Sequence, residues 1–205
     1  MSTTSLLAEC QRLWPIAQIV PARKTEVYAV AKRLIEAAAK ARYQAISGTT
    51  TVPWQVIAVI HEREADQDFD CQLGQGDPLD EVSRHVPRGR GPFFNHPSDP
   101  PGQDAFYRAA VDALQNCPPY AARWTNWTAP GACTLLIDYN GDGYERYHNE
   151  VSPYIWGATT VEEEGKYVSD GHWSAGVWDT QIGCAAMLKA MMDLDPSIKF
   201  AEAAA

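Results

Sequence analysis

The chain has 205 residues, of which 45% are hydrophobic and 21% are charged, and its formal net charge is −9. This size and balance predict a folded domain with a substantial core. The negative charge argues against a nucleic-acid partner, because phosphate binding needs clustered Lys and Arg. The apolar runs are too short to cross a bilayer, so we expect no integral membrane segment.

In chain order, residues 1–24 are predicted to form an N-terminal extension, residues 25–195 the folded domain and residues 196–205 a C-terminal tail. Residues 25–46 are rich in Ala and straight-chain residues and carry apolar side chains at helical spacing, which predicts a helix. Pro53 is well placed in the first turn of a second helix that continues to residue 64.

The middle of the chain, residues 65–103, is dense in proline and glycine, and such a long irregular segment usually has a functional role. Helical spacing returns over residues 104–116. A short apolar helix is predicted to end near residue 138, followed by aromatic loops over 145–177 and a closing helix over 178–192. Few stretches alternate as strands do, so the prediction is a mainly α single domain with long ordered loops.

The end of the second predicted helix carries an acid on an apolar face. Ile60, His61 and Glu64 fall on one stripe with Ile57, whereas Glu62 lies about 200° away from Glu64. Burial at that position favours the neutral carboxyl, which a general acid needs, and His61 is near enough to orient Glu64 or the substrate. The alternative is that Glu64 only ends the helix in a salt bridge.

A series of motifs in one order resembles the lysozyme-like peptidoglycan hydrolases of phages and bacteria. The motifs are "VPWQVIAVIHEREADQDFDCQLGQGDPL", "VPRGRGPF", "AVDAL", "DYNGDGY", "SPYIWG", "GKYVSDG" and "DTQIGCAAMLKAM", and they cover about residues 25–192. The resemblance implies a lysozyme-like fold whose loops form a cleft. It also implies a catalytic Glu at a helix end, here Glu64, and a Tyr-Asn turn on the opposite wall, here Tyr139 and Asn140.

Residues 138–144, "DYNGDGY", allow two interpretations. Asp138, Asn140 and Asp142 alternate before a glycine, as calcium-loop ligands do, but position twelve of such a loop is Asn149 rather than Glu. A sugar-binding turn explains the neighbouring tyrosines better. We therefore expect Tyr139, Asn140 and Tyr144 to bind substrate, with no metal or cofactor, and keep a calcium-stabilised loop as the alternative.

Glycoside hydrolysis commonly uses a second carboxylate. Asp77, in the "GQGDPL" loop, is the preferred candidate, because a Gly-Asp-Pro turn could hold it near the helix end. The alternative is that Asp77 only shapes its turn. Asp66, Asp68, Asp70 and Asp142 are also possible. A lytic transglycosylase, by resemblance, needs one Glu alone.

The seven tryptophans are mostly expected in the core or supporting loops. Tyr154 and Trp156, between the turn residues of "SPYIWG", are the preferred aromatic residues for a cleft. The "GKYVSDG" segment is compatible with a cleft loop, a hairpin or a helix entry.

The predicted function is a peptidoglycan muramidase or endolysin that cleaves the β-1,4 bond between N-acetylmuramic acid and N-acetylglucosamine. A lytic transglycosylase or chitinase is the alternative on the same fold, and a non-catalytic glycan-binding or calcium-stabilised module is the alternative of another class. The N-terminus shows no secretory signal. We therefore expect a protein that is made in the cytoplasm and reaches the wall through a holin pore or by delivery from a phage or secretion particle. We also expect it to be a monomer.

Overall fold

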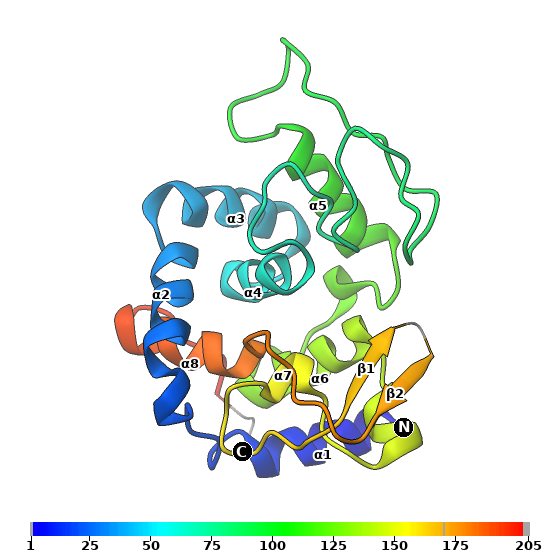
Figure 1. The fold of residues 1–205 in the computed structure, drawn as a ribbon. Helices are drawn as coiled ribbons and strands as arrows, with labels where there is room; N and C mark the ends of the chain where they lie inside the picture. The colour runs from blue at the N-terminus through cyan, green and yellow to red at the C-terminus, as the bar shows by residue number, and fades with distance from the viewer. Residues whose placement is uncertain (1, 170, 203–205) are drawn as a thin grey trace. The chain divides into compact units, whose positions relative to one another are not determined.

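The computed structural model describes residues 2–169 and 171–202, and it is mainly helical, which confirms the predicted class (Figure 1). The chain divides into two compact units. The central unit is Arg33–Thr125, and the terminal unit combines Met1–Lys32 with Asn126–Ala205.

The predicted helix over residues 25–46 is two helices, α2 (Lys24–Leu34) and α3 (Ala37–Thr50). The backbone of Glu36, at φ −54° and ψ 140°, leaves the helical region and precedes the first turn of α3. The single-helix prediction is therefore wrong. Neither Ile35 nor Glu36 is a helix breaker, so the apolar spacing continues through the break without a signal.

The central unit is built around α4 (Trp54–Ala65), which packs against α3, while α3 also packs against α5 (Ala105–Asn116). Pro53 directly precedes α4, close to its predicted place. Every residue from Gln55 to Glu62 is buried, so α4 is enclosed on all sides rather than on one stripe. The short helix η2 (Ala121–Arg123) lies near the end of this unit and packs against α5.

The segment from residue 66 to residue 104 contains no helix or strand beyond an isolated bridge between Cys71 and Pro78, which confirms the predicted irregular segment. It ends at Asp104, whose carboxylate accepts a hydrogen bond from the Tyr107 backbone N–H at 3.0 Å. This side-chain cap explains why α5 begins at the next residue.

In the terminal unit, α1 (Thr3–Leu13) lies within the predicted N-terminal extension and packs against α6 (Ala129–Asn140). The short α7 (Pro153–Trp156) packs against α6 and α8 (Cys184–Leu194). The unit also contains η1 (Pro21–Arg23) and the π-helical turn η3 (Tyr144–His148).

The region predicted as loops between residues 145 and 177 contains regular structure. Strands β1 (Lys166–Ser169) and β2 (His172–Ser174) pair in antiparallel fashion, so the hairpin interpretation of "GKYVSDG" is confirmed outside residue 170, which lies beyond the described residues. The closing helix, predicted from residue 178, begins only at Cys184, directly after Gly183, whose backbone is extended.

Across the described residues, no helix combines the length and apolar character that a membrane span requires. All five cysteines are free thiols, and four of them are buried. The four buried thiols act as small apolar core residues.

Candidate functional site

Glu64 lies in the last turn of α4, and its side chain is half-buried. The two residues that follow the helix, Asp66 and Gln67, both adopt left-handed backbone conformations, with φ of 49° and 61°. The Asp66 N–H donates to the carbonyl of Glu62. The chain therefore turns sharply away just after the candidate acid.

The Gly-Gln-Gly-Asp-Pro loop contacts the same helix end. A Cβ atom added to Gly76 would lie 2.3 Å from the Glu64 backbone carbonyl oxygen, and Gly76 has a φ of +70°. Both the close approach and the left-handed conformation require glycine. This loop therefore packs directly on the residue predicted to be the acid.

His61 is fully buried one turn before Glu64, so its ring does not face solvent. The Asp68 backbone carbonyl can only accept, so His61 Nε2 carries the proton and donates to it at 2.9 Å. His61 Nδ1 then accepts from the Tyr43 hydroxyl at 2.9 Å. Burial lowers the pKa of His61 to about 4, so the ring is neutral at physiological pH.

These contacts give His61 a role in holding the turn after Glu64. The Gln67 side-chain amide donates to the Tyr43 hydroxyl at 3.2 Å and to the Arg33 carbonyl at 3.3 Å. Of its two predicted roles, orienting Glu64 fits a buried ring, whereas direct contact with substrate does not. The network ties α3, α4 and the turn at residues 66–68 together.

Tyr43→Phe is expected to lower the free energy of unfolding by about 1–3 kcal/mol, because it leaves His61 Nδ1 buried without a donor. Urea unfolding of the variant and the parent measures the difference. Tyr107→Phe is the matched control in the same unit, since the Tyr107 hydroxyl bonds Thr49 at an exposed position. Equal effects of the two substitutions would contradict the role given to Tyr43.

Glu62 is the more buried of the two glutamates at this helix end. Both of its carboxylate oxygens lie 2.6 Å from Nη2 of Arg33. Burial raises the pKa of Glu62, although Arg33 acts in the opposite direction. The sequence correctly placed Glu62 away from the Glu64 stripe but gave no sign of its partner, which lies 29 positions earlier.

Asp77 is buried, and its own loop occupies its carboxylate. The backbone N–H groups of Arg84 and His85 donate to one oxygen at 2.8 and 3.0 Å, and His85 Nδ1 lies 2.8 Å from the other. Burial alone would raise the pKa of Asp77, but these hydrogen bonds outweigh it and lower the pKa. These are the contacts of a residue that shapes its loop, which was the alternative interpretation.

The other predicted substrate-binding residues lie in the terminal unit. Tyr139 is half-buried and Asn140 is exposed, both in the last turn of α6 rather than in a free turn. Tyr144 is buried, and its hydroxyl accepts from the Tyr167 backbone N–H at 3.0 Å.

Of the predicted site residues, Glu64, His61 and the loop of Asp77 lie together within the central unit.

Tyr154 and Trp156 were the preferred cleft aromatics, but they are 4% and 0% exposed. They belong to α7, all four residues of which are buried. Neither presents a free ring face on which a sugar could stack. The turn residues around "SPYIWG" lead into and out of a core helix rather than an open loop.

The calcium alternative at residues 138–149 meets a geometric obstacle. Asp138 and Asn140 are both within α6, where side chains two positions apart point in different directions. Among the residues described by the structure, no group of three or more His, Cys, Asp or Glu side chains is placed to hold a metal ion.

Glu145, in η3, is a buried carboxyl that no sequence pattern marks as a candidate. It is 3% exposed, and Oε1 accepts from the Ser152 backbone N–H at 3.1 Å. Burial raises the pKa of Glu145 to about 7, and the neighbouring acids Glu9 and Asp142 act in the same direction. No periodicity marks it, because a single π-helical turn has no sequence signature of its own.

This raised pKa predicts a dependence of stability on pH. The folded state holds the proton of Glu145 more tightly than the unfolded chain, whose pKa is near 4.5. The contribution of Glu145 to the free energy of unfolding is therefore complete below pH 4.5. It is lost as the pH rises to about 7, a change of roughly 3 kcal/mol. Glu145→Gln should flatten this dependence in urea unfolding between pH 4.5 and 8. Glu164→Gln, at an exposed position of the same unit, is the control, and equal slopes in both variants would contradict the prediction.

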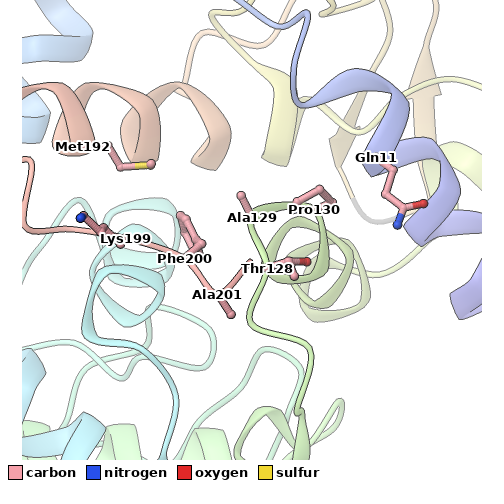
Figure 2. Close-up of a pocket in the computed structure, with 8 residues that line it drawn as sticks. All are labelled: Gln11, Thr128, Ala129, Pro130, Met192, Lys199, Phe200 and Ala201. Atoms are coloured by element: carbon pink, nitrogen blue, oxygen red, sulfur yellow. The ribbon is translucent and has the colours of Figure 1, made fainter. Parts of the chain in front are cut away.

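Figure 2 shows a pocket of about 370 Å³ in the terminal unit, with Met192 and Phe200 on one side and Ala129 and Pro130 on the other. Phe200 packs edge-on against Trp14, with ring centroids 6.1 Å apart. Lys199 is the one charged side chain among the described residues that line it. Such a lining holds no group suited to acid–base chemistry on a sugar.

A second pocket of the terminal unit, of about 420 Å³, includes Trp178 together with Arg23, Glu162 and Asp179. The seven tryptophans are mostly expected in the core or supporting loops, but 52% of Trp178 is exposed. Its neighbours Val177 and Thr180 are also exposed, so the indole lies on an irregular surface segment ahead of α8. No spacing in the sequence distinguishes it from the buried tryptophans.

Comparison with known proteins finds no match to a family model, to a curated protein or to a solved structure. The chemistry of the described side chains therefore carries the functional proposal. In the central unit, that chemistry is a half-buried carboxyl on a helix end fixed by buried hydrogen bonds. Such a carboxyl suits proton transfer to a bound substrate.

Proposed function

We propose that this chain is a lysozyme-like glycoside hydrolase that cleaves the β-1,4 bond between N-acetylmuramic acid and N-acetylglucosamine in peptidoglycan. The observation that carries the proposal is the position of Glu64 at the end of the enclosed helix α4, where Gly76 packs on its carbonyl. The ordered motifs that resemble lysozyme-like hydrolases supply the substrate class.

In the proposed reaction, Glu64 donates its proton to the glycosidic oxygen as the bond to the sugar breaks. The fixed helix end holds the carboxyl of Glu64 in one place, which favours proton transfer to a correctly placed glycosidic oxygen. His61 contributes by locking the turn that follows, through Asp68 and Tyr43. It stays neutral, so it adds no charge beside the acid.

Besides proton donation by Glu64, hydrolysis needs a base or nucleophile on the other face of the sugar. Asp77 accepts three hydrogen bonds from its own loop, which makes it a poor choice for this role. Asp66, Asp68 and Asp70 are exposed and follow Glu64 closely in the chain. Activation of a water by one of these carboxylates gives a hydrolase. Attack by the muramic acid's own hydroxyl, whose proton passes to the Glu64 carboxylate, gives the anhydro product of a lytic transglycosylase. Tyr139 and Asn140 stay predicted sugar contacts.

Digestion of purified peptidoglycan, followed by mass spectrometry of the soluble products, tests the proposal. Products with reducing ends indicate hydrolysis, and anhydro ends indicate a transglycosylase on the same acid. If the protein binds the wall but releases no glycan fragments, the proposal fails, and a non-catalytic glycan-binding module takes its place.

A further inference from the structure

The pocket that contains Trp178 combines an exposed aromatic face with hydrogen-bonding side chains. Its volume of about 420 Å³ lies within the range of about 300–1,000 Å³ that is typical of small-molecule sites. It is lined by Val20, Arg23, Ala158, Thr159, Thr160, Glu162, Trp178 and Asp179.

The wall of this pocket is a fixed piece of backbone. Val20 N–H donates to the Ala158 carbonyl at 3.0 Å, and Thr160 N–H donates to the Gln18 carbonyl at 2.8 Å. Between them, Ile19 and Thr159 form an antiparallel bridge. A wall already formed before binding lowers the entropic cost of taking up a ligand.

The three charged side chains that line the pocket each have a partner within the protein. Arg23 donates to Glu26 at 2.8 Å and to the Thr180 carbonyl at 2.7 Å. Asp179 accepts from Lys166 Nζ at 2.7 Å, and Glu162 accepts from the Ala158 backbone N–H at 2.8 Å. These internal partners favour a neutral polar ligand over an ion.

We propose that this pocket binds a neutral N-acetylhexosamine ring of a glycan chain, with the ring stacked on the indole of Trp178. Sugar rings present an apolar C–H face to an aromatic plane and hydroxyl groups at their edges, which match the polar side chains around Trp178. The site goes beyond the proposed function, because binding here requires no cleavage by Glu64.

Titration calorimetry with the β-1,4 tetramer of N-acetylglucosamine tests this site. The titrations use the Glu64→Gln background, so that the tetramer stays intact. Trp178→Ala is expected to weaken binding about tenfold or more, whereas Trp178→Phe keeps an aromatic face and retains most of the affinity. Tyr147→Ala is the control, because Tyr147 is 69% exposed in the same unit but does not line the pocket.

Equal affinities of Trp178→Ala and Tyr147→Ala would overturn the proposal, as would an absence of tetramer binding in the Glu64→Gln background. Preferential binding of choline would also overturn it, because it would assign the indole to a cation. Binding is measured apart from cleavage, so a failure of the hydrolase proposal leaves this result readable.

Discussion

Glu64→Gln is expected to slow glycan cleavage by about 10²–10⁴-fold, the usual contribution of a general acid, while the protein stays folded. Glutamine keeps the shape of the side chain but has no proton to transfer to the leaving oxygen. The rate of muropeptide release from purified peptidoglycan measures the loss. Circular dichroism and wall binding, both expected to be unchanged, show that the fold is retained.

Glu62→Gln is the matched control, because Glu62 is a second glutamate in the last turns of α4. Its carboxylate accepts hydrogen bonds from Arg33. Its loss should therefore reduce stability more than the rate of the chemical step. If Glu62→Gln abolishes cleavage and Glu64→Gln does not, the acid has been assigned to the wrong glutamate.

Gly76→Ala is expected to lower the free energy of unfolding by about 2–4 kcal/mol. The new Cβ would meet the Glu64 carbonyl oxygen at 2.3 Å, and the left-handed backbone adds strain at φ +70°. The oxygen belongs to the backbone of a packed helix end, so it cannot move aside cheaply. Urea unfolding measures the loss, and the fraction that stays folded should also cleave more slowly because the support of Glu64 is displaced.

Gly89→Ala separates these two causes. Gly89 has a similar φ of +76° within the same irregular segment, but nothing lies within 4 Å of its Cβ position. Its substitution should therefore cost only the conformational strain, about 1 kcal/mol. If Gly76→Ala lowers the free energy of unfolding no more than Gly89→Ala does, the contact between Gly76 and Glu64 does not contribute to stability.

The sequence predicts the central unit well where a local signal marks each boundary. Pro53 marks the start of α4, and Asp104 caps α5, so both helices are found within one or two residues. The dense prolines and glycines between them mark the irregular segment. The break at Glu36 carries no such signal, because only its backbone angles leave the helix, so α2 and α3 were predicted as one element.

The place of Glu64 at a helix end could be predicted from the sequence, but the contacts that support that helix end could not. Helical spacing places Glu64 at the end of an apolar face, whereas the partners of His61 come from positions as distant as Tyr43. The sequence also does not predict which aromatic residues are buried. Trp156 and Trp178 both stand in turn-rich sequence, yet packing between helices buries the first and leaves the second exposed.

The release of soluble muropeptides from purified peptidoglycan, by the parent protein and by Glu64→Gln in parallel, tests the central claim most directly. The proposed role of Glu64 predicts cleaved glycan products from the parent and almost none from the variant, with equal binding of both proteins to the wall. Equal release by the two proteins, or no release by a parent that still binds, would contradict it.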